Sequence, residues 1–277
     1  MAPATGRVQA PAVARASAVL TILMCSCVLA ASARADAPAI DNSVFGGAGV
    51  FIDNYGNFPG PWALADELER NHFTWVALHV HNGLYQLAGN DQWIEVLREH
   101  GLKVGGWGYE EEHPVISAVL ADLAVKQYHL DFYIADAEAP YTQTKKVKGW
   151  RRSKQFVDTF RWLQPTLPAA ITTYGAAIAP WVLPIDFAAW RSAGFDLLPQ
   201  AYYNQFPKVY RPDMTVAHAE RAGWPLERVH PVIGVFRKYP AANYVPLLQA
   251  AGTTGFSVWI GDQATAADYA ALGVLTH

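Results

Sequence analysis

Residues 131–138, with the sequence DFYIADAE, combine a β-forming run with two acidic side chains at its end. Aromatic and β-branched residues favour a strand that packs on both faces. Because side chains two apart in a strand point to the same face, Asp136 and Glu138 share a face with Ile134. The stretch therefore predicts a buried strand that ends in two neighbouring carboxylates.

Seven further β-rich runs lie in the chain, and helix-like segments separate them. Strands joined by helical crossovers run parallel to one another. Eight such units in about 240 residues fit an α/β fold that is a single closed (β/α)8 TIM-type barrel better than an open doubly wound sheet. The predicted strands cover residues 48–53, 74–80, 103–109, 131–138, 169–174, 195–203, 230–236 and 255–260. The predicted helices cover residues 61–71, 91–100, 114–127, 153–163, 185–192, 212–222, 241–251 and 265–272.

The position of the glycines near the first strand argues against a doubly wound fold that binds a nucleotide. Gly46-Gly47-Ala48-Gly49 precedes that strand, whereas a phosphate-binding loop follows it. The doubly wound nucleotide-binding fold therefore loses its main support.

A different kind of segment opens the chain. Arg7 and Arg15 precede an apolar run over residues 16–31, and Ala33-Arg34-Ala35 supplies the small-x-small pattern that a signal peptidase cuts. The run is shorter than the roughly 20 apolar residues of a membrane-spanning helix. We therefore predict a cleaved secretory signal peptide, no stable membrane insertion of the mature chain, and a secreted protein that is extracellular or periplasmic.

This assignment sets the domain boundaries. The signal peptide covers residues 1–35, and the (β/α)8 barrel covers residues 36–277. Cys25 and Cys27 are the only cysteines, and both lie in the signal segment. The mature chain thus lacks the thiols needed for a disulfide, a thiolate metal site or a cysteine nucleophile.

Composition narrows the class of partner. The chain is 52% hydrophobic and carries a net charge of −3 with no long run of either sign, so nothing in it favours binding to nucleic acid. Its ten Trp and thirteen Tyr suit a large core, and some of these rings are available for stacking on sugars. No repeat or linker is visible, and we expect a monomer.

Functional residues of a parallel barrel lie where its strands end. Carboxylates, amides and aromatic rings dominate those positions in this sequence. The predicted catalytic residues are Asp136, Glu138 and, after the first strand, Asp53. The predicted substrate-binding residues are His79, Trp107, Tyr109, Glu110, Gln200, Tyr202, Trp259 and Asp262.

The two carboxylates of the fourth strand suggest a chemistry. Like charges held close together and partly buried cannot both ionise cheaply, so one of Asp136 and Glu138 should keep its proton. A protonated acid beside an ionised one is suited to cleaving a glycosidic bond, because the acid protonates the leaving oxygen and its partner stabilises positive charge on the sugar. The sequence therefore predicts a glycan-cleaving enzyme that needs no cofactor.

Residues 131–138 resemble the fourth-strand motif D-x-x-D-x-D-x-E of family 18 chitinases, with Ile134 at the middle aspartate position. Gln200 to Asn204 is similar to the Q-x-Y-N type strand of those enzymes, and Trp259 falls where their eighth strand carries a tryptophan. The chain also resembles family 25 lysozymes, which pair an aspartate after strand one, here Asp53, with a D-x-E on strand four. The lysozyme-type Asp-Val-Ser signature at strand one is absent.

The resemblance implies roles for individual residues. Glu138 would be the general acid, and Asp136 would orient the N-acetyl group of the substrate. Tyr202 would bind that group or the developing ring, and Asp53 would be a supporting carboxylate. The implied substrate is a β-linked N-acetylated polysaccharide such as chitin or peptidoglycan. Because glycosidase barrels are reused for binding, a catalytically inactive carbohydrate-binding barrel is the alternative.

Three other motifs allow second interpretations. His79-Val80-His81 has the H-x-H form of metal-dependent hydrolases, and strand alternation would aim both rings the same way. Such a metal site needs more ligands from later strands, and strands five and six offer no histidine at their ends, so we predict no metal. Residues 110–112 are three glutamates that form either a solvated loop or, through Glu110, part of the groove. The cations that follow the fourth strand form either a solvated helix entrance or a surface that attracts an anionic cell-wall polymer. These cations are Lys145, Lys146, Lys148, Arg151 and Arg152.

Overall fold

The structure is a computed structural model, and it describes residues 40–54, 58, 60–87, 90–180, 182–206, 208–236 and 239–276. The predicted signal peptide lies outside the described residues. Within them, no helix is long and apolar enough to cross a membrane.

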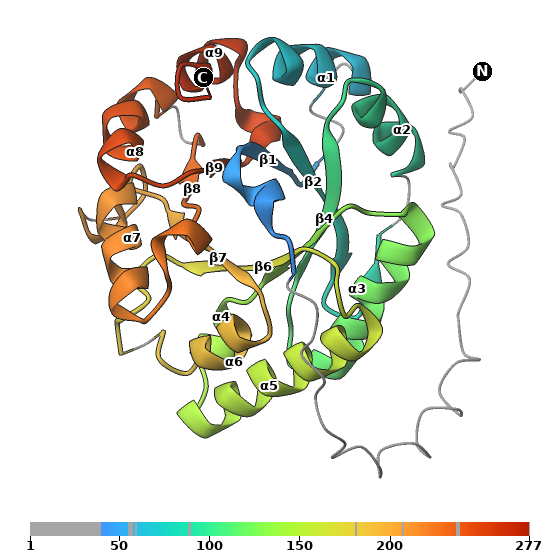
Figure 1. The fold of residues 1–277 in the computed structure, drawn as a ribbon, viewed down its shortest axis with the longest axis vertical. Coiled ribbons are helices and arrows are strands. Elements are labelled where there is room, and N and C mark those ends of the chain that lie inside the picture. The colour runs from blue at the N-terminus through green and yellow to red at the C-terminus, as the bar shows by residue number, and fades with distance from the viewer. Residues whose placement is uncertain are drawn as a thin grey trace, which may run out of the picture. The chain divides into compact units, whose positions relative to one another are not determined.

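The described strands form one closed barrel. They follow the order β1-β9-β8-β7-β6-β5-β4-β2-β3, and a further pairing of β1 with β2 closes the ring. All pairings are parallel except the antiparallel hairpin of β2 and β3. The predicted (β/α)8 barrel is confirmed, with its helices on the outside (Figure 1). The strands are β1 Ala48–Ile52, β2 Trp75–Asn82, β3 Tyr85–Gln86, β4 Lys103–Tyr109, β5 Tyr133–Asp136, β6 Ala169–Tyr174, β7 Asp196–Ala201, β8 Val232–Gly234 and β9 Phe256–Trp259.

The helices fill the crossovers between strands. The α-helices are α1 Pro61–Arg70, α2 Asp91–Glu99, α3 Pro114–Tyr128, α4 Ala139–Thr142, α5 Lys146–Leu163, α6 Phe187–Ser192, α7 Pro212–Arg221, α8 Val245–Ala251 and α9 Ala266–Gly273. The 3-10 helices are η1 Ser43–Gly46, η3 Lys208–Tyr210, η4 Leu226–Arg228, η5 Ala241–Tyr244 and η6 Gly261–Gln263.

Three elements depart from the sequence prediction. The short strand β3 and the one-turn helix α4 were not expected, and α5 begins at Lys146 instead of at residue 153. Gly149 lies inside the early part of α5, where a β-carbon would stand 2.4 Å from the backbone oxygen of Pro184. Glycine lowers helix propensity, yet close packing at this position requires it.

Strand alternation divides the core into two layers. One apolar cluster fills the barrel and includes Trp75, Phe132 and Ile134, and the larger one lies between the strands and the helices. Phe45 of η1 seals the amino-terminal end of the barrel, with its ring 5.3 Å from the ring of Phe132. The inner layer is thus solid below the carboxyl ends of the strands, and the site stands above it.

An irregularity in β2 corrects one sequence prediction. The register with β4 shifts between His79, which pairs with Trp107, and His81, which pairs with Gly108. His79 stacks on the inward-facing Trp107, while His81 hydrogen-bonds Tyr133 in the outer layer. The expectation that both rings point the same way is wrong, because the bulge turns them into different layers.

Candidate active site

The carboxylate couple, Asp136 and Glu138, lies at the carboxyl end of β5. Ile134 belongs to the apolar cluster that fills the barrel, and Asp136 stands two residues further along the same face. Asp136 is 8% exposed, whereas Glu138 is half-buried and immediately precedes α4. Strand alternation therefore places one acid deep in the barrel mouth and the other above it.

Gln200 on β7 joins the two acids. Its Nε2 donates to Glu138 Oε1 at 2.5 Å and lies 3.4 Å from Asp136 Oδ1. One amide group, two strands away around the mouth, therefore contacts both carboxyl groups. The resemblance between the segment around Gln200 and a glycosidase strand thus corresponds to a direct contact with the predicted acids.

Burial sets the protonation of the couple. It raises the pKa of Asp136 well above the ordinary value, and the charges of Glu138 and then Glu110 raise it further. Burial also raises the pKa of Glu138, against the opposing effect of hydrogen bonds from Gln200 and Tyr174. The couple therefore holds on to protons at pH values where exposed carboxylic acids are ionised.

Two connected spaces open above the couple. A cavity of about 60 Å³ is walled by Asp136, Glu138 and Gln200 together with aromatic and apolar residues of five further strands. A groove of about 440 Å³ shares Glu138 and Gln200 with it. The other lining residues shared by both spaces are Tyr202 and Trp259. Predicted catalytic and binding residues thus meet at one open site.

Tyrosine hydroxyls surround the couple. Burial raises the pKa of Tyr109 to about 12, and the negative charges of Glu138 and Asp136 contribute to the shift. Burial and the same two acids raise the pKa of Tyr202 well above its usual value. Both tyrosines are therefore neutral donors beside the acids, as their positions at strand ends suggested.

The predicted residues Trp107, His79 and Asp53 form a second row at the mouth. The His79 ring stacks on Trp107 with centroids 3.7 Å apart, and its Nδ1 lies 2.8 Å from Asp53 Oδ1. Trp107 lines the cavity, whereas Asp53 is 41% exposed and lies outside the lining of both spaces. Asp53 is thus linked to the site through His79 and does not share a hydrogen bond with the couple.

Two predicted binding residues lie away from the open space. Glu110 is fully buried, accepts a hydrogen bond from the Tyr133 hydroxyl at 2.8 Å, and belongs with His81 to a cluster that we call the outer network (His81, Glu110 and Tyr133). Asp262 lies in η6, whose neighbouring residue Gln263 lines the groove instead. The Glu110 side chain therefore lies across the barrel wall from the couple, where its charge raises the pKa of Asp136.

The described residues offer no set of ligands for the metal site that the H-x-H motif suggested. In the part of the chain that the structure describes, no group of three or more His, Cys, Asp or Glu side chains is arranged to hold a metal ion. His79 and His81, the pair that raised this alternative, lie in different layers.

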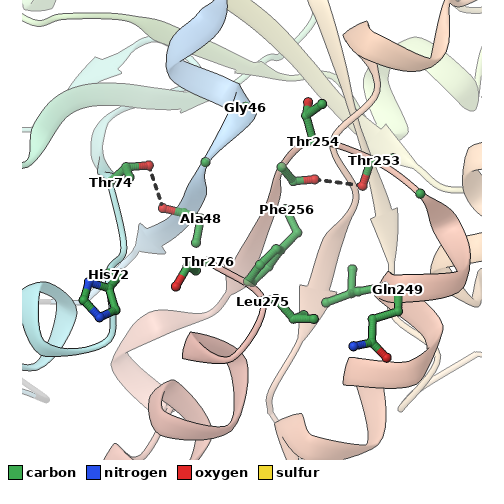
Figure 2. Close-up of a pocket in the computed structure, with 14 residues that line it drawn as sticks. Gly46, Ala48, His72, Thr74, Gln249, Thr253, Thr254, Phe256, Leu275 and Thr276 are labelled. Atoms are coloured by element: carbon green, nitrogen blue, oxygen red, sulfur yellow. Dashed lines mark hydrogen bonds between the residues drawn. The ribbon is translucent and has the colours of Figure 1, made fainter.

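The opposite end of the barrel has a pocket of a different kind. It measures about 380 Å³ and is formed where β1, β2 and β9 begin (Figure 2). Threonines and backbone atoms dominate its wall, with Thr74 donating to the Ala48 carbonyl at 3.2 Å. Its described lining residues include no carboxylate.

Sequence reasoning missed several residues that line the site. Tyr174 ends β6, pairs with Gln200, and contacts Glu138 through its hydroxyl. Tyr174 is the last residue of a strand that was predicted. The rule that functional residues of a parallel barrel lie where its strands end therefore applies to Tyr174 as well. Further lining residues that were not predicted are Thr172, Gln205, Phe206, Phe236, Ile260 and Gln263.

Comparison with known proteins gives similarity in structure alone. No protein-family model matches the sequence, and no curated protein matches it. A GH18 chitinase from Cycas revoluta, solved in complex with (GlcNAc)3, has a TM-score of 0.64 and 11% sequence identity over 83% of this chain and 99% of that one. A class V chitinase from Pseudomonas fluorescens has a TM-score of 0.60 and 11% identity over 82% of this chain and 98% of that one. A chitinase-like agglutinin from Robinia pseudoacacia has a TM-score of 0.60 and 9% identity over 81% of this chain and 98% of that one. At these identities the similarity establishes the barrel fold.

Proposed function

We propose that this chain is a secreted glycoside hydrolase that cleaves a β-linked N-acetylated glycan such as chitin or peptidoglycan. The observation that carries the proposal is the pair of acids, the buried Asp136 and the half-buried Glu138, contacted by one amide of Gln200 at the floor of an open groove. The structural similarity to chitinases solved with chitin oligosaccharides supports the same substrate class.

Glu138 acts as the general acid. Burial raises its pKa and so favours the protonated acid, and Glu138 lines both the cavity and the groove, where a bound chain can reach it. The proton passes from Glu138 to the glycosidic oxygen as the bond from that oxygen to the anomeric carbon breaks. The carboxylate left on Glu138 then takes a proton from the water that completes hydrolysis.

Asp136 supports the developing positive charge. In the mechanism that the family resemblance implies, the acetamido oxygen of the substrate bonds to the anomeric carbon, and its N–H becomes more acidic. A carboxyl group in the buried mouth, fixed beside Gln200, accepts that N–H more strongly as charge develops than in the ground state. In this proposal Tyr202, a neutral hydroxyl that lines both spaces, binds the same group.

The second candidate function is a carbohydrate-binding barrel without turnover. Ile134 stands where the chitinase motif has an aspartate, and its surroundings are apolar, so no deeper carboxylate shares the proton of Asp136. The fold similarity to a chitinase-like agglutinin supports this alternative.

Glu138→Gln separates the two candidates, because it keeps the shape and the hydrogen bond of the side chain while removing the acidic proton. For an enzyme we expect turnover of chitin oligosaccharides or peptidoglycan fragments to fall by about 100- to 10,000-fold with binding retained, as product masses and calorimetry would show. Glu95→Gln, an exposed change on α2, is the matched control and should leave both unchanged. Undiminished turnover in Glu138→Gln would reject the acid, and binding without turnover in the unaltered protein would establish the binding barrel.

A further inference from the structure

The first turns of α5 carry an exposed cluster of cationic and apolar side chains. We call it the α5 patch and define it as Lys145, Lys146, Val147, Trp150 and Arg151. The three cations are exposed, and Trp150 is 42% exposed. The patch includes most of the basic cluster that the sequence analysis singled out and that the catalytic site does not use.

The positive charge of this cluster is only partly neutralised. Glu112 pairs with Lys148 at 3.7 Å and with Arg152 at 2.9 Å. Across the described residues, Lys145, Lys146 and Arg151 form no ion pair with a carboxylate.

The position of these cations does not stabilise α5 itself. The first turn of α5 has no acidic residue, and cations near the start of a helix are repelled by its dipole. A cluster that opposes helix stability is a candidate for function.

Trp150 is an exposed ring in a fixed orientation. Its Nε1 donates to the Leu183 carbonyl at 3.2 Å, and Lys146 Nζ lies 4.4 Å from the ring centroid. A fixed aromatic ring loses little conformational entropy when a ligand packs against it. The patch thus combines a flat apolar surface with unpaired cations.

The patch lies at the same end of the barrel as the groove. Glu138 connects directly to α4, and a β-carbon on Gly149 would stand 2.8 Å from the Tyr141 oxygen of that helix and 2.4 Å from the Pro184 oxygen. Both neighbours belong to segments that follow the carboxyl ends of β5 and β6. Figure 1 shows α4 beside the early part of α5. A polymer that leaves the groove past Glu138 on the side of α4 can therefore reach the α5 patch.

We propose that the α5 patch docks an acidic polysaccharide, and that the polymer cut at Glu138 carries carboxylate groups, as peptidoglycan does and chitin does not. The inference rests on the proposed function and narrows its substrate. A nucleic acid or an anionic membrane fits less well, because the chain has a net charge of −3 and the patch offers three unpaired cations, fewer than the about four to eight of a lipid-binding basic cluster.

The test compares charge-matched triple variants. Lys145→Gln with Lys146→Gln and Arg151→Gln removes the charge of the patch. The control Lys103→Gln with Lys126→Gln and Arg221→Gln removes the same charge from exposed positions on other elements, β4, α3 and α7. In the Glu138→Gln background, we expect the patch variant to bind insoluble peptidoglycan about 10-fold more weakly at low salt, with the difference shrinking at high salt, and the control to bind as before.

The aromatic ring has its own matched control on the same helix. Trp150→Ala should weaken binding to peptidoglycan by about 5-fold, while Trp162→Ala, which truncates a ring that is 77% exposed near the far end of α5, should not. Colloidal chitin, with an N-acetylated but neutral chain, should bind all the charge variants alike.

The outcomes separate this inference from the proposed function. Equal losses on peptidoglycan and chitin, or equal losses in the patch and control variants, overturn the docking surface while leaving turnover at Glu138 untouched. Stronger patch-dependent binding to phosphatidylglycerol vesicles or to DNA than to peptidoglycan overturns it as well. If no glycan is cleaved but the patch-dependent, salt-sensitive binding to peptidoglycan persists, the proposed hydrolysis fails and the docking surface stands.

Discussion

The carboxylate couple and the outer network are two buried acidic clusters on opposite faces of the same strands. Asp136 and Glu138 project from β5 into the barrel mouth, and Tyr133 projects from β5 into the layer under the helices. Glu110 follows β4, and its backbone N–H donates to the Asp136 carbonyl at 2.9 Å. The clusters are therefore close neighbours that differ mainly in which side of the barrel wall they occupy.

Both clusters have perturbed protonation, but only one borders an open space. Burial raises the pKa of Glu110 to about 8 and lowers that of His81 to about 3, so both groups are neutral over much of the range between. The Tyr133 hydroxyl lies between them, 2.6 Å from His81 Nε2. A shifted pKa by itself thus marks burial, and the cavity beside the couple is what makes chemistry feasible there.

The largest difference between the two clusters is expected in turnover, when one acid of each cluster is replaced by its amide. Asp136→Asn removes the carboxyl group that supports the developing charge, and we expect turnover to fall by roughly 100- to 1,000-fold. Glu110→Gln replaces an acid that is already neutral below about pH 8, and turnover near pH 6 should change by less than about 3-fold. Steady-state rates on the best glycan substrate check both values, and comparable losses in the two variants would remove the distinction between the clusters.

For stability the order of the two clusters should be reversed, with the larger loss on removal of the Glu110 side chain. Glu110→Ala opens a cavity in a fully buried network and leaves the Tyr133 hydroxyl without its carboxyl partner, which should cost about 3 kcal/mol of unfolding free energy. Asp136→Asn removes a desolvated acid beside another and should change stability by less than about 1 kcal/mol, or increase it. Urea unfolding measures both, and a Glu110→Ala protein as stable as the parent would contradict the structural role of the outer network.

The pH dependence of stability isolates the charge of Glu110. Its pKa rises from an ordinary 4.5 to about 8 on folding, so the unfolded chain releases this proton first. Its stabilising contribution is complete below about pH 4.5 and is lost as the pH rises toward 8, at up to about 1.4 kcal/mol per pH unit. Glu110→Gln should reduce the slope of unfolding free energy between pH 5 and 8, where Asp136 and Glu138 still contribute in the same direction. An unchanged slope would mean that Glu110 is ionised in the folded protein.

The same comparison shows what local sequence predicts. Alternation within residues 131–138 was enough to place Asp136 and Glu138 together, because neighbours along one strand need no knowledge of the rest of the fold. The burial of Glu110 depends on how α3 and α5 cover the sheet, which residues 110–112 do not encode. The bulge beside His81 likewise arises from pairing between β2 and β4. Tyr174 is a different case, since its strand was predicted and its inward position followed from alternation.

The smallest expected effects come from removing one hydroxyl in each cluster. The Tyr174 hydroxyl donates to Glu138 and holds the pKa of that acid lower than burial alone would, so Tyr174→Phe should raise it. Because activity falls as rising pH deprotonates the general acid, the alkaline limb of the rate profile should move to higher pH, with kcat/KM reduced by about 3- to 10-fold at neutral pH. Tyr133→Phe, the matched change behind the barrel wall, should cost about 1 kcal/mol of stability and leave that limb in place. A limb that moves in Tyr133→Phe and stays fixed in Tyr174→Phe would assign the titrating acid to the outer network.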